Sequence, residues 1–332
     1  MLRVIALFAV VAALLLPLPA FGMPPQVGVI ENFGPSLQSR CHNPEGIAID
    51  PTGNVYAASF AFEPVANICV VGPSQALVDV IPIPAGSAGV ASLLGELFEP
   101  GQGLYVLDFA NGTVPNGRVL KVDAATHAVT TLATGFAAPN AVAQDRHRNL
   151  FVSDSFLGRI NRVAPDGGSN VVWIESSLLR TNGSPPFGAN GVAFDPNQRF
   201  LYVANTGDSR VLRVPVLADG SAGPIEIFAD GATINARQAT TQALHGADGI
   251  MFDVHDNLYV CANQANEIQV LSPAAELIDR FSGSGANALD FPASLVFKER
   301  ELFVTNLSLA TGAANSKLSV LRTEVPGLPL RP

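Results

Sequence analysis

The stretch "GADGIMFDVHDNLYV", residues 246–260, decides the fold because its pattern recurs along the chain. It places an acid, Asp248, before a short apolar run, and a turn containing Asp253 separates that run from a second strand-like segment. Two short apolar runs joined by a tight turn are typical of an antiparallel sheet. The position of Asp248 is unusual, since a carboxylate at the mouth of a buried strand is costly unless another group compensates its charge.

Five other segments follow the same plan. They are "PEGIAIDPTGNVYAAS" (44–59), "PNAVAQDRHRNLFVSD" (139–154), "ANGVAFDPNQRFLYVAN" (189–205) and the weaker "LLGELFEPGQGLYVLD" (93–108) and "PASLVFKERELFVTN" (292–306). Each unit continues with a third strand-like segment, and five continue with a fourth. The segment "VGVIENFG" (27–34) resembles those fourth strands, so we expect it to complete the last unit.

Repeats of four short strands at a period of about 40–50 residues predict a β-propeller, in which each blade is one sheet. We therefore predict an all-β fold, a six-bladed β-propeller over residues 23–325 whose last blade is closed by an N-terminal strand. Residues 326–332 form a Pro-rich tail.

The chain begins with a pattern typical of a removed secretory signal. Residues 1–22 contain Arg3, an apolar stretch over residues 4–16, and the small residues Ala20 and Gly22 at the positions of a signal-peptidase site. We expect an exported protein, periplasmic or secreted. No later apolar run approaches the roughly 20 residues needed to cross a bilayer, so no membrane span is predicted.

Charge and cysteine content narrow the partners and the compartment. The net charge is −9 with only 14% charged residues, which disfavours a nucleic-acid or anionic-membrane partner and favours a small-molecule substrate. The sequence indicates no oligomeric state. Cys41 and Cys69 either form a disulfide in an oxidising compartment or remain unpaired core residues, and Cys261 is expected to be a buried thiol.

The repeats also predict a functional site. In a propeller the first strand of each blade lies nearest the central channel, so the residue just before each first strand occupies the same end of the channel in every blade. These residues are Glu45, Leu94, Asn140, Asn190, Asp248 and Ala293. Four of the six carry a side-chain oxygen, and the pseudo-symmetry brings them around one axis.

Two carboxylates and two amides form a set of hard oxygen ligands that suits Ca²⁺, although another divalent cation is possible. We therefore predict a metal site made by Glu45, Asn140, Asn190 and Asp248, whose cation would compensate the charge of Asp248. The alternative is that these residues only cap turns. The metal is favoured because other acids already fill the turn role at the opposite end, namely Asp50, Asp145, Asp195 and Asp253.

The motifs "PEG", "PNA", "ANGVAFDP" and "ADGIMFD" resemble those of the senescence marker protein (regucalcin), gluconolactonase and diisopropylfluorophosphatase family of six-bladed propellers. The resemblance covers essentially the mature chain. It implies that Glu45, Asn190 and Asp248 bind a catalytic divalent metal, and that Asn140 contacts metal or substrate. Two departures, Ala141 and Ala293, weaken a phosphotriesterase assignment.

The resemblance implies hydrolysis of lactones or related esters. Asp248 would then be catalytic, as a general base on water or as a nucleophile, and His245 would assist near the substrate, although a solvated loop histidine is the simpler interpretation. A non-catalytic binding propeller of the NHL type and a lyase resembling the streptogramin-cleaving propellers, with His245 as base, remain alternatives. The connections 180–189, with Phe187, and 231–247 either form walls or a lid at this end of the channel or are ordinary solvent loops.

Overall fold

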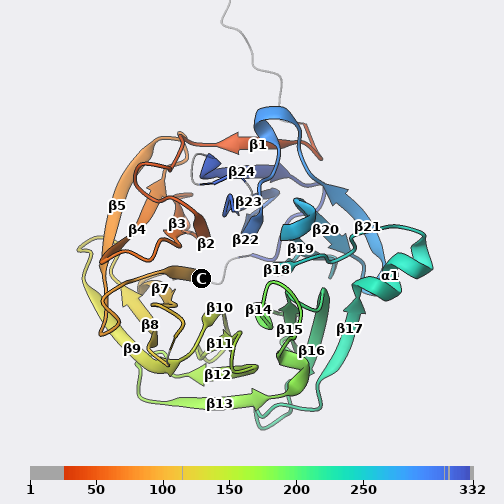
Figure 1. Ribbon diagram of the computed structural model, residues 1–332, viewed down its shortest axis with the longest axis horizontal. Coiled ribbons are helices and arrows are strands. Elements are labelled where there is room, and N and C mark those ends of the chain that lie inside the picture. The colour runs from red at the N-terminus through yellow and green to blue at the C-terminus, as the bar shows by residue number, and fades with distance from the viewer. Residues whose placement is uncertain (1–25, 114, 310, 313–314, 330–332) are drawn as a thin grey trace, which may run out of the picture.

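The computed structural model describes residues 26–329 apart from residues 114, 310, 313 and 314, so the predicted signal segment 1–22 lies outside it. The described residues form six four-stranded antiparallel sheets arranged around a central axis, as Figure 1 shows. The six-bladed propeller predicted from the repeats is therefore confirmed. One α-helix, α1 (Gly231–Gln238), and short 3-10 turns are the helical elements of the described chain.

The blades follow the chain in order. Blades 1 to 3 consist of β2 (Pro44–Ile49), β3 (Val55–Ser59), β4 (Val65–Val71) and β5 (Leu77–Pro84); β6 (Leu93–Glu99), β7 (Gly103–Asp108), β8 (Gly117–Val122) and β9 (Val129–Phe136); and β10 (Pro139–Gln144), β11 (Leu150–Asp154), β12 (Arg159–Val163) and β13 (Asn170–Glu175). Blades 4 to 6 consist of β14 (Ala189–Phe194), β15 (Phe200–Asn205), β16 (Arg210–Pro215) and β17 (Glu226–Asp230); β18 (Ala247–Phe252), β19 (Leu258–Ala262), β20 (Glu267–Leu271) and β21 (Leu277–Phe281); and β22 (Pro292–Lys298), β23 (Glu301–Asn306), β24 (Lys317–Arg322) and β1 (Ile30–Phe33).

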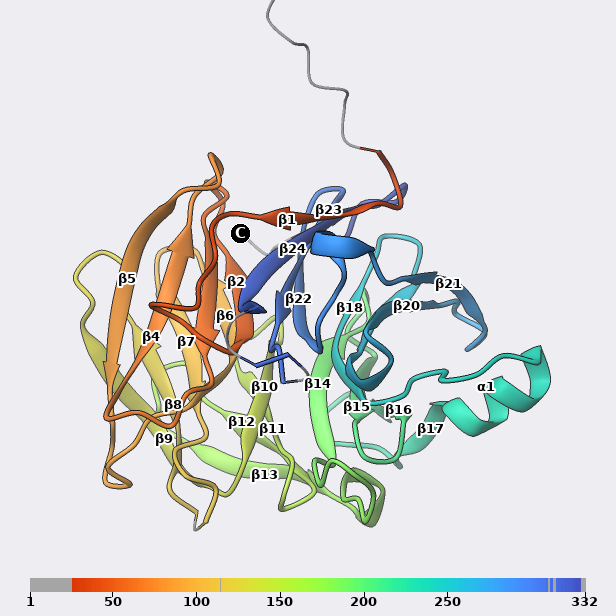
Figure 2. The ribbon, with the colours of Figure 1, turned by 45° about the horizontal axis from the view of Figure 1, so that its top comes forward.

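Blade 6 is built from both ends of the chain. Strand β1 pairs antiparallel with β24, with Ile30 opposite Leu321 and Phe33 opposite Leu318. Figure 2 shows β1 lying across the outside of β24. Backbone hydrogen bonds between the two terminal segments therefore hold the ring closed.

The core is distributed between the blades. Six apolar clusters in the described residues each join two neighbouring sheets, one for every interface of the ring. In blade 1, for example, Ile68 and Ile81 are fully buried in the cluster that also contains Leu104 of blade 2. Each blade buries its apolar faces against its neighbours, as in other repeat architectures.

A disulfide fastens the closure. Cys41, in the segment that runs from β1 to blade 1, is bonded to Cys69 of β4, and their Cα atoms are 6.0 Å apart. Both sulfurs lie in the apolar cluster between blades 6 and 1. Cys261 is a buried free thiol, as expected.

The connection 231–247 does not have the predicted form along its first half. Asp230 accepts a hydrogen bond from the Thr233 N–H and starts α1, and Gln238 donates to Leu277 O at 3.1 Å. Figure 1 shows α1 at the outer edge of the ring. The expectation that this half is a loop forming a wall or lid is therefore wrong, because the segment has a side-chain N-cap and packs on the outer strand β21.

Removing the disulfide should weaken the closed ring. In the double variant Cys41→Ser/Cys69→Ser we expect the free energy of unfolding to fall by about 2–5 kcal/mol, because the bond closes a loop of moderate length in the unfolded chain. Chemical denaturation of wild type and variant measures the change, with Cys261→Ser as the control for losing a thiol. An unchanged midpoint in the double variant would show that the bond does not stabilise the closure.

Candidate metal centre at one end of the channel

The six residues predicted to surround the axis occupy equivalent places in the structure. Each is the second residue of the first strand of its blade, and we call this set the axis ring: Glu45, Leu94, Asn140, Asn190, Asp248 and Ala293. In all six blades the pairing of the first two strands shifts register across this residue, as from Ala247 to Ile250 in blade 5. Such a bulge bends the strand and redirects a side chain.

The backbone of each axis residue is held by the blade before it. In four blades the residue after the axis residue is glycine, which allows close contact with the axis carbonyl of the next blade. A Cβ atom would lie 2.1 Å from Leu94 O at Gly46, 2.5 Å from Asn140 O at Gly95, 2.2 Å from Asp248 O at Gly191 and 2.6 Å from Ala293 O at Gly249. Blades 3 and 6 have Ala141 and Ser294 there instead. In these blades a hydroxyl makes the link, as Ser153 Oγ donates to Asn190 O at 2.7 Å and Thr305 Oγ1 donates to Glu45 O at 2.6 Å.

A second set of equivalent residues follows the second strand of each blade. Its backbone N–H donates to the carbonyl just before the first strand, and we call it the support ring: Phe60, Phe109, Ser155, Thr206, Asn263 and Leu307. Two members orient axis residues directly. Asn263 Nδ2 donates to Asp248 Oδ2 at 2.8 Å, and Asn190 Nδ2 donates to Thr206 Oγ1 at 2.9 Å.

The sequence prediction missed the support ring, although Asn263 is the last letter of the repeat "ADGIMFDVHDNLYVCAN". Gly246 also belongs to this arrangement, because a Cβ atom there would lie 2.0 Å from Asn263 Oδ1, and its φ of +70° suits glycine. The offset of 15 residues from Asp248 to Asn263 recurs between Glu45 and Phe60, and offsets in the other blades are the same or differ by one residue. This near-periodicity was the available signal.

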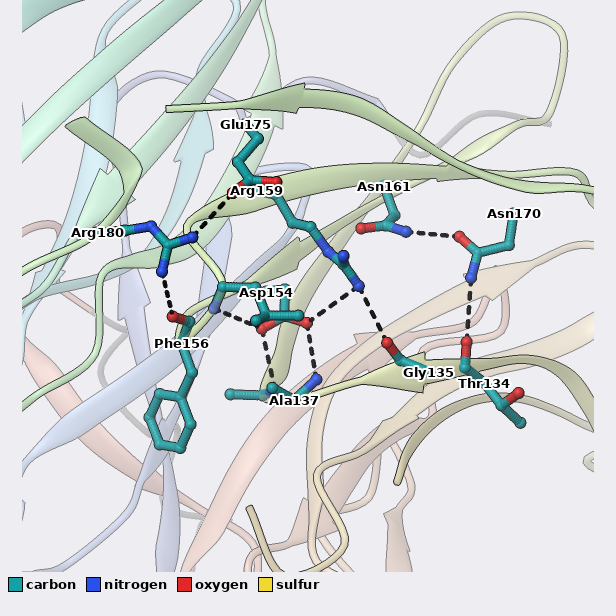
Figure 3. Close-up of polar contacts among 12 residues, drawn as sticks. Thr134, Gly135, Ala137, Asp154, Phe156, Arg159, Asn161, Asn170, Glu175 and Arg180 are labelled. Atoms are coloured by element: carbon teal, nitrogen blue, oxygen red, sulfur yellow. Dashed lines mark hydrogen bonds and ion pairs between the residues drawn. The ribbon is translucent and has the colours of Figure 1, made fainter. Parts of the chain in front are cut away.

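The turn before Asn140 is held by an acid at the end of β11. Asp154 Oδ2 accepts from the Ala137 N–H at 2.8 Å and Oδ1 from the Ala138 N–H at 3.1 Å. Figure 3 shows this carboxylate between the Ala137 backbone and the Arg159 guanidinium, 3.9 Å away. Asn140 therefore enters the axis ring from a fixed backbone.

The turn acids lie at the opposite end of the first strands, as predicted. Asp253, for example, accepts hydrogen bonds from the backbone N–H groups of His255 and Asn257 at 2.8 and 2.9 Å. Asp50, Asp145 and Asp195 bind the turns that follow them in the same way. Turn capping at that end leaves the oxygens of the axis ring free for another role.

Those axis oxygens are buried and mostly unpartnered. Glu45, Asn140, Asn190 and Asp248 are only 3–4% exposed. Among the described residues, three of their oxygens, Glu45 Oε2, Asn140 Oδ1 and Asp248 Oδ1, have no hydrogen-bond partner, while Asn190 donates its Nδ2 to Thr206 Oγ1. Buried polar oxygens are rarely left unpaired in folded proteins, and each such group needs a physical reason.

Burial also disfavours the charged forms of the two acids. Burial, then the negative charges of Asp248 and Glu96, raise the pKa of Glu45 well above its usual value. Burial raises the pKa of Asp248 to about 7, against the lowering effect of the hydrogen bond from Asn263. No positively charged side chain of the described residues contributes to the pKa of either acid.

Glu96 is a third acid of the channel that sequence reasoning missed. It stands two residues after Leu94 in β6, where the other blades have apolar residues such as Ile47 and Val142. It is 8% exposed, neither carboxylate oxygen has a partner in the described part of the chain, and burial raises its pKa well above its usual value. Glu96 borders a cavity of about 140 Å³ lined by the first strands of all six blades.

The remaining predicted features fit less directly. His245 is half-buried in the loop before β18, and its Nδ1 has no hydrogen-bond partner; in the described structure its imidazole makes no bond to Asp248. The connection 180–189 borders a cavity of about 670 Å³ together with Ser155 and Phe156.

The described residues contain no group of three or more His, Cys, Asp or Glu side chains placed to bind a metal, so a cation at the axis ring needs the amide oxygens as well. No helix in the described part of the chain is long and apolar enough to span a bilayer.

The free energy of unfolding should fall as pH rises from about 5 to about 8 when a chelator removes metal ions. Asp248 has a pKa near 7 in the folded protein and 3.8 in the reference state, so the folded state retains a proton that the unfolded chain has released. Glu45 and Glu96 act in the same direction. Acids with lowered pKa values, such as Asp50 and Glu99, titrate below this window. Denaturant titrations at several pH values measure the slope.

The variant Glu96→Leu tests the energetic cost of one buried carboxylate by itself. At about pH 8 it should be more stable than wild type by about 1–3 kcal/mol, because leucine removes an unpaired buried carboxylate and restores the apolar residue of the other blades. A stability that increases with pH in the chelator, or a Glu96→Leu variant that is less stable, would contradict this electrostatic account.

The comparisons with known proteins agree with the sequence pattern. Residues 184–308 match the family model described as "SMP-30/Gluconolactonase/LRE-like region". The fold is similar to that of a luciferin-regenerating enzyme (TM-score 0.64, 18% identity, 90% of this chain and 97% of that chain) and of a gluconolactonase from Xanthomonas campestris (0.61, 17%, 88% and 89%). It is also similar to the calcium-binding protein regucalcin from Agrobacterium tumefaciens (0.62, 15%, 89% and 95%).

At these identities the structural likeness establishes the fold alone. No curated protein sequence matches this chain significantly. The predicted resemblance is nevertheless confirmed at the level of sequence, since residues 184–308, which include Asn190 and Asp248, carry the pattern of the SMP-30/gluconolactonase/LRE-like family.

Proposed function

We propose that this protein is a divalent-metal-dependent hydrolase of lactones or related esters, with Ca²⁺ as the favoured cation. The observation that carries the proposal is the set of buried, unpartnered oxygens on Glu45, Asn140 and Asp248, which occupy equivalent positions around one axis. The match of residues 184–308 to a family that includes gluconolactonases supports the reaction class.

The residues fit a hard divalent cation. Glu45 and Asp248 would supply two negative charges, and Asn140 and Asn190 would add neutral amide oxygens, a mixture that Ca²⁺ accepts in its flexible shell. Binding would compensate the desolvated carboxylates, whose pKa values are raised in the absence of a cation. Asn263 and Thr206 would hold Asp248 and Asn190 in orientation, as outer partners of metal ligands commonly do.

The proposed reaction opens a lactone with water. The cation, when bound, would supply positive charge beside the substrate carbonyl. Asp248 would accept the proton from water as the water oxygen attacks the carbonyl carbon, and the proton would pass to the ring oxygen as the C–O bond breaks, giving a hydroxy acid. Direct attack by the Asp248 carboxylate is the other route, and it would give an acyl intermediate that water then cleaves.

Calcium binding and lactone turnover should fail together when Asp248 is replaced. In calorimetric titrations we expect wild type to bind one Ca²⁺ per chain, Asp248→Asn to bind far more weakly, and Asn263→Ala to bind about 10–100-fold more weakly than wild type. On a panel of lactones and aryl esters, Asp248→Asn should lose about 10²–10⁴-fold in kcat.

The matched control is Asp253→Asn, which makes the same change in a buried acid at the other end of β18. It should retain calcium binding and turnover. Binding without turnover on any substrate would favour the non-catalytic propeller, whereas turnover that survives Asp248→Asn but not His245→Ala would favour the lyase.

We also propose that the protein is exported to the periplasm or secreted. The pattern of residues 1–22 and the Cys41–Cys69 disulfide, a bond typical of oxidising compartments, support this. Intact-mass measurement of the protein from its native host should give a chain that begins at Met23. A chain isolated from the cytoplasm with residues 1–22 attached would contradict the proposal.

A further inference from the structure

The end of the channel that carries the axis ring also carries a cluster of phenylalanines. We call it the phenylalanine wall: Phe60, Phe62, Phe109, Phe156 and Phe187. Phe109 is its centre, with ring centroids 5.7 Å from Phe60, 6.0 Å from Phe62, 5.7 Å from Phe156 and 6.3 Å from Phe187. Phe156 and Phe187 are themselves 5.3 Å apart. The rings therefore form one continuous aromatic surface.

The wall borders the axis ring at one position. Phe60, Phe109, Phe156 and Phe187 pack in one apolar cluster with Leu94, the axis residue of blade 2, and with Ala138, which stands two residues before Asn140. Leu94 is an axis residue without a side-chain oxygen, and it lies between Glu45 of blade 1 and Asn140 of blade 3 in the order of the ring. Blade 2 therefore contributes no oxygen to the proposed ligand set, and its axis residue Leu94 packs against the phenylalanine wall instead.

The wall lies across the axis from the proposed catalytic acid. Leu94 belongs to blade 2 and Asp248 to blade 5, and Figure 1 shows the sheets of these two blades on opposite sides of the ring. A substrate whose carbonyl faces Asp248 would therefore direct its substituent toward blade 2 and the phenylalanines.

The support ring divides in the same way. In blades 3 to 5 its members are Ser155, Thr206 and Asn263, which hydrogen-bond to the backbone or side chains around Asn190 and Asp248. In blades 6, 1 and 2 its members are Leu307, Phe60 and Phe109. One half of this end of the channel orients polar groups, and the other half presents apolar surface.

The aromatic rings are anchored but remain accessible. Arg180, which is itself paired with Glu175 at 2.9 Å, donates to Phe156 O at 3.5 Å, as Figure 3 shows, and Gly207 N–H donates to Phe187 O at 2.9 Å. Phe109 is buried, whereas Phe60, Phe156 and Phe187 are half-buried and Phe62 is 46% exposed. A cluster that served the core alone would not leave four of five rings open to solvent.

We infer that the phenylalanine wall is a specificity subsite for an alkyl or aryl substituent of the substrate, so that the protein prefers apolar lactones to polyhydroxylated ones. The inference rests on the proposed function and adds the substrate class. The hydroxyl groups of a sugar lactone would lose their water against these rings and gain few partners there, whereas an alkyl chain would bury apolar surface.

The test compares three six-membered lactones: unsubstituted δ-valerolactone, its 5-pentyl derivative and glucono-δ-lactone. Wild type with Ca²⁺ should show a kcat/KM for the pentyl lactone at least about tenfold above that for δ-valerolactone, and higher still relative to the sugar lactone after correction for spontaneous hydrolysis. In Phe187→Ala and Phe156→Ala this advantage should fall about tenfold.

Phe200→Ala is the matched control, since Phe200 is a half-buried ring at the opposite end of blade 4. It should keep the pentyl preference. Equal or lower kcat/KM for the pentyl lactone in wild type, or a preference that Phe156→Ala and Phe187→Ala leave intact, would overturn the inference while the proposed hydrolase function stands.

A second measurement separates the two proposals if wild type hydrolyses none of the lactones. Calorimetry would then compare binding of 5-hydroxydecanoate, the product of the pentyl lactone, with binding of gluconate. Tighter binding of 5-hydroxydecanoate that weakens in Phe187→Ala would support the apolar subsite although the hydrolase proposal had failed. Equal binding of the two acids would overturn the subsite as well.

Discussion

The contact between each axis residue and the blade before it is the constraint on which the rest of the structure depends. In four blades a glycine allows the first strand to lie against the carbonyl of the axis residue in the next blade. In the other two blades a serine or threonine hydroxyl donates a hydrogen bond to that carbonyl. Because the contact repeats around the ring, six bulged strands converge on one axis. Four residues with oxygen-bearing side chains, distant in the sequence, thereby occupy equivalent positions around the axis.

The convergence of the six strands also buries three acidic side chains in the channel. Two carboxylates and a third, Glu96, are desolvated in one channel, and their pKa values are raised. Such an arrangement is costly for folding unless a positive charge offsets it. The support ring holds the Asp248 carboxylate in one orientation through the hydrogen bond from Asn263.

The sequence was sufficient for the repeated strands, the axis ring and the turn acids, but not for the support ring, which also repeats. The position of the strands, the axis ring and the turn acids each recur in unit after unit, and the fold and the placement of these residues could be predicted from them. Features in which one blade differs from the rest were missed. Glu96 replaces an apolar residue in a single unit, and Asn263 acts through a side-chain bond that only the fold creates. The phenylalanine wall assembles from the connections after the second strands of blades 1 to 3 and from the segment before blade 4, so only Phe187 was noticed. The helix α1 was missed because an N-cap on Asp230 outweighs the Gly- and Thr-rich composition of its segment.

The function proposed for this protein depends on Glu45, Asn140, Asn190 and Asp248 sharing one cation at the mouth of the channel. The most direct measurement is a crystal structure of protein prepared at millimolar calcium, in which a lanthanide is then substituted for the calcium. The anomalous scattering of the lanthanide locates the ion. We expect a single strong peak at the axis, with oxygen ligands from these four residues at about 2.3–2.6 Å. Ordered axis side chains without a peak between them would contradict the proposed metal site.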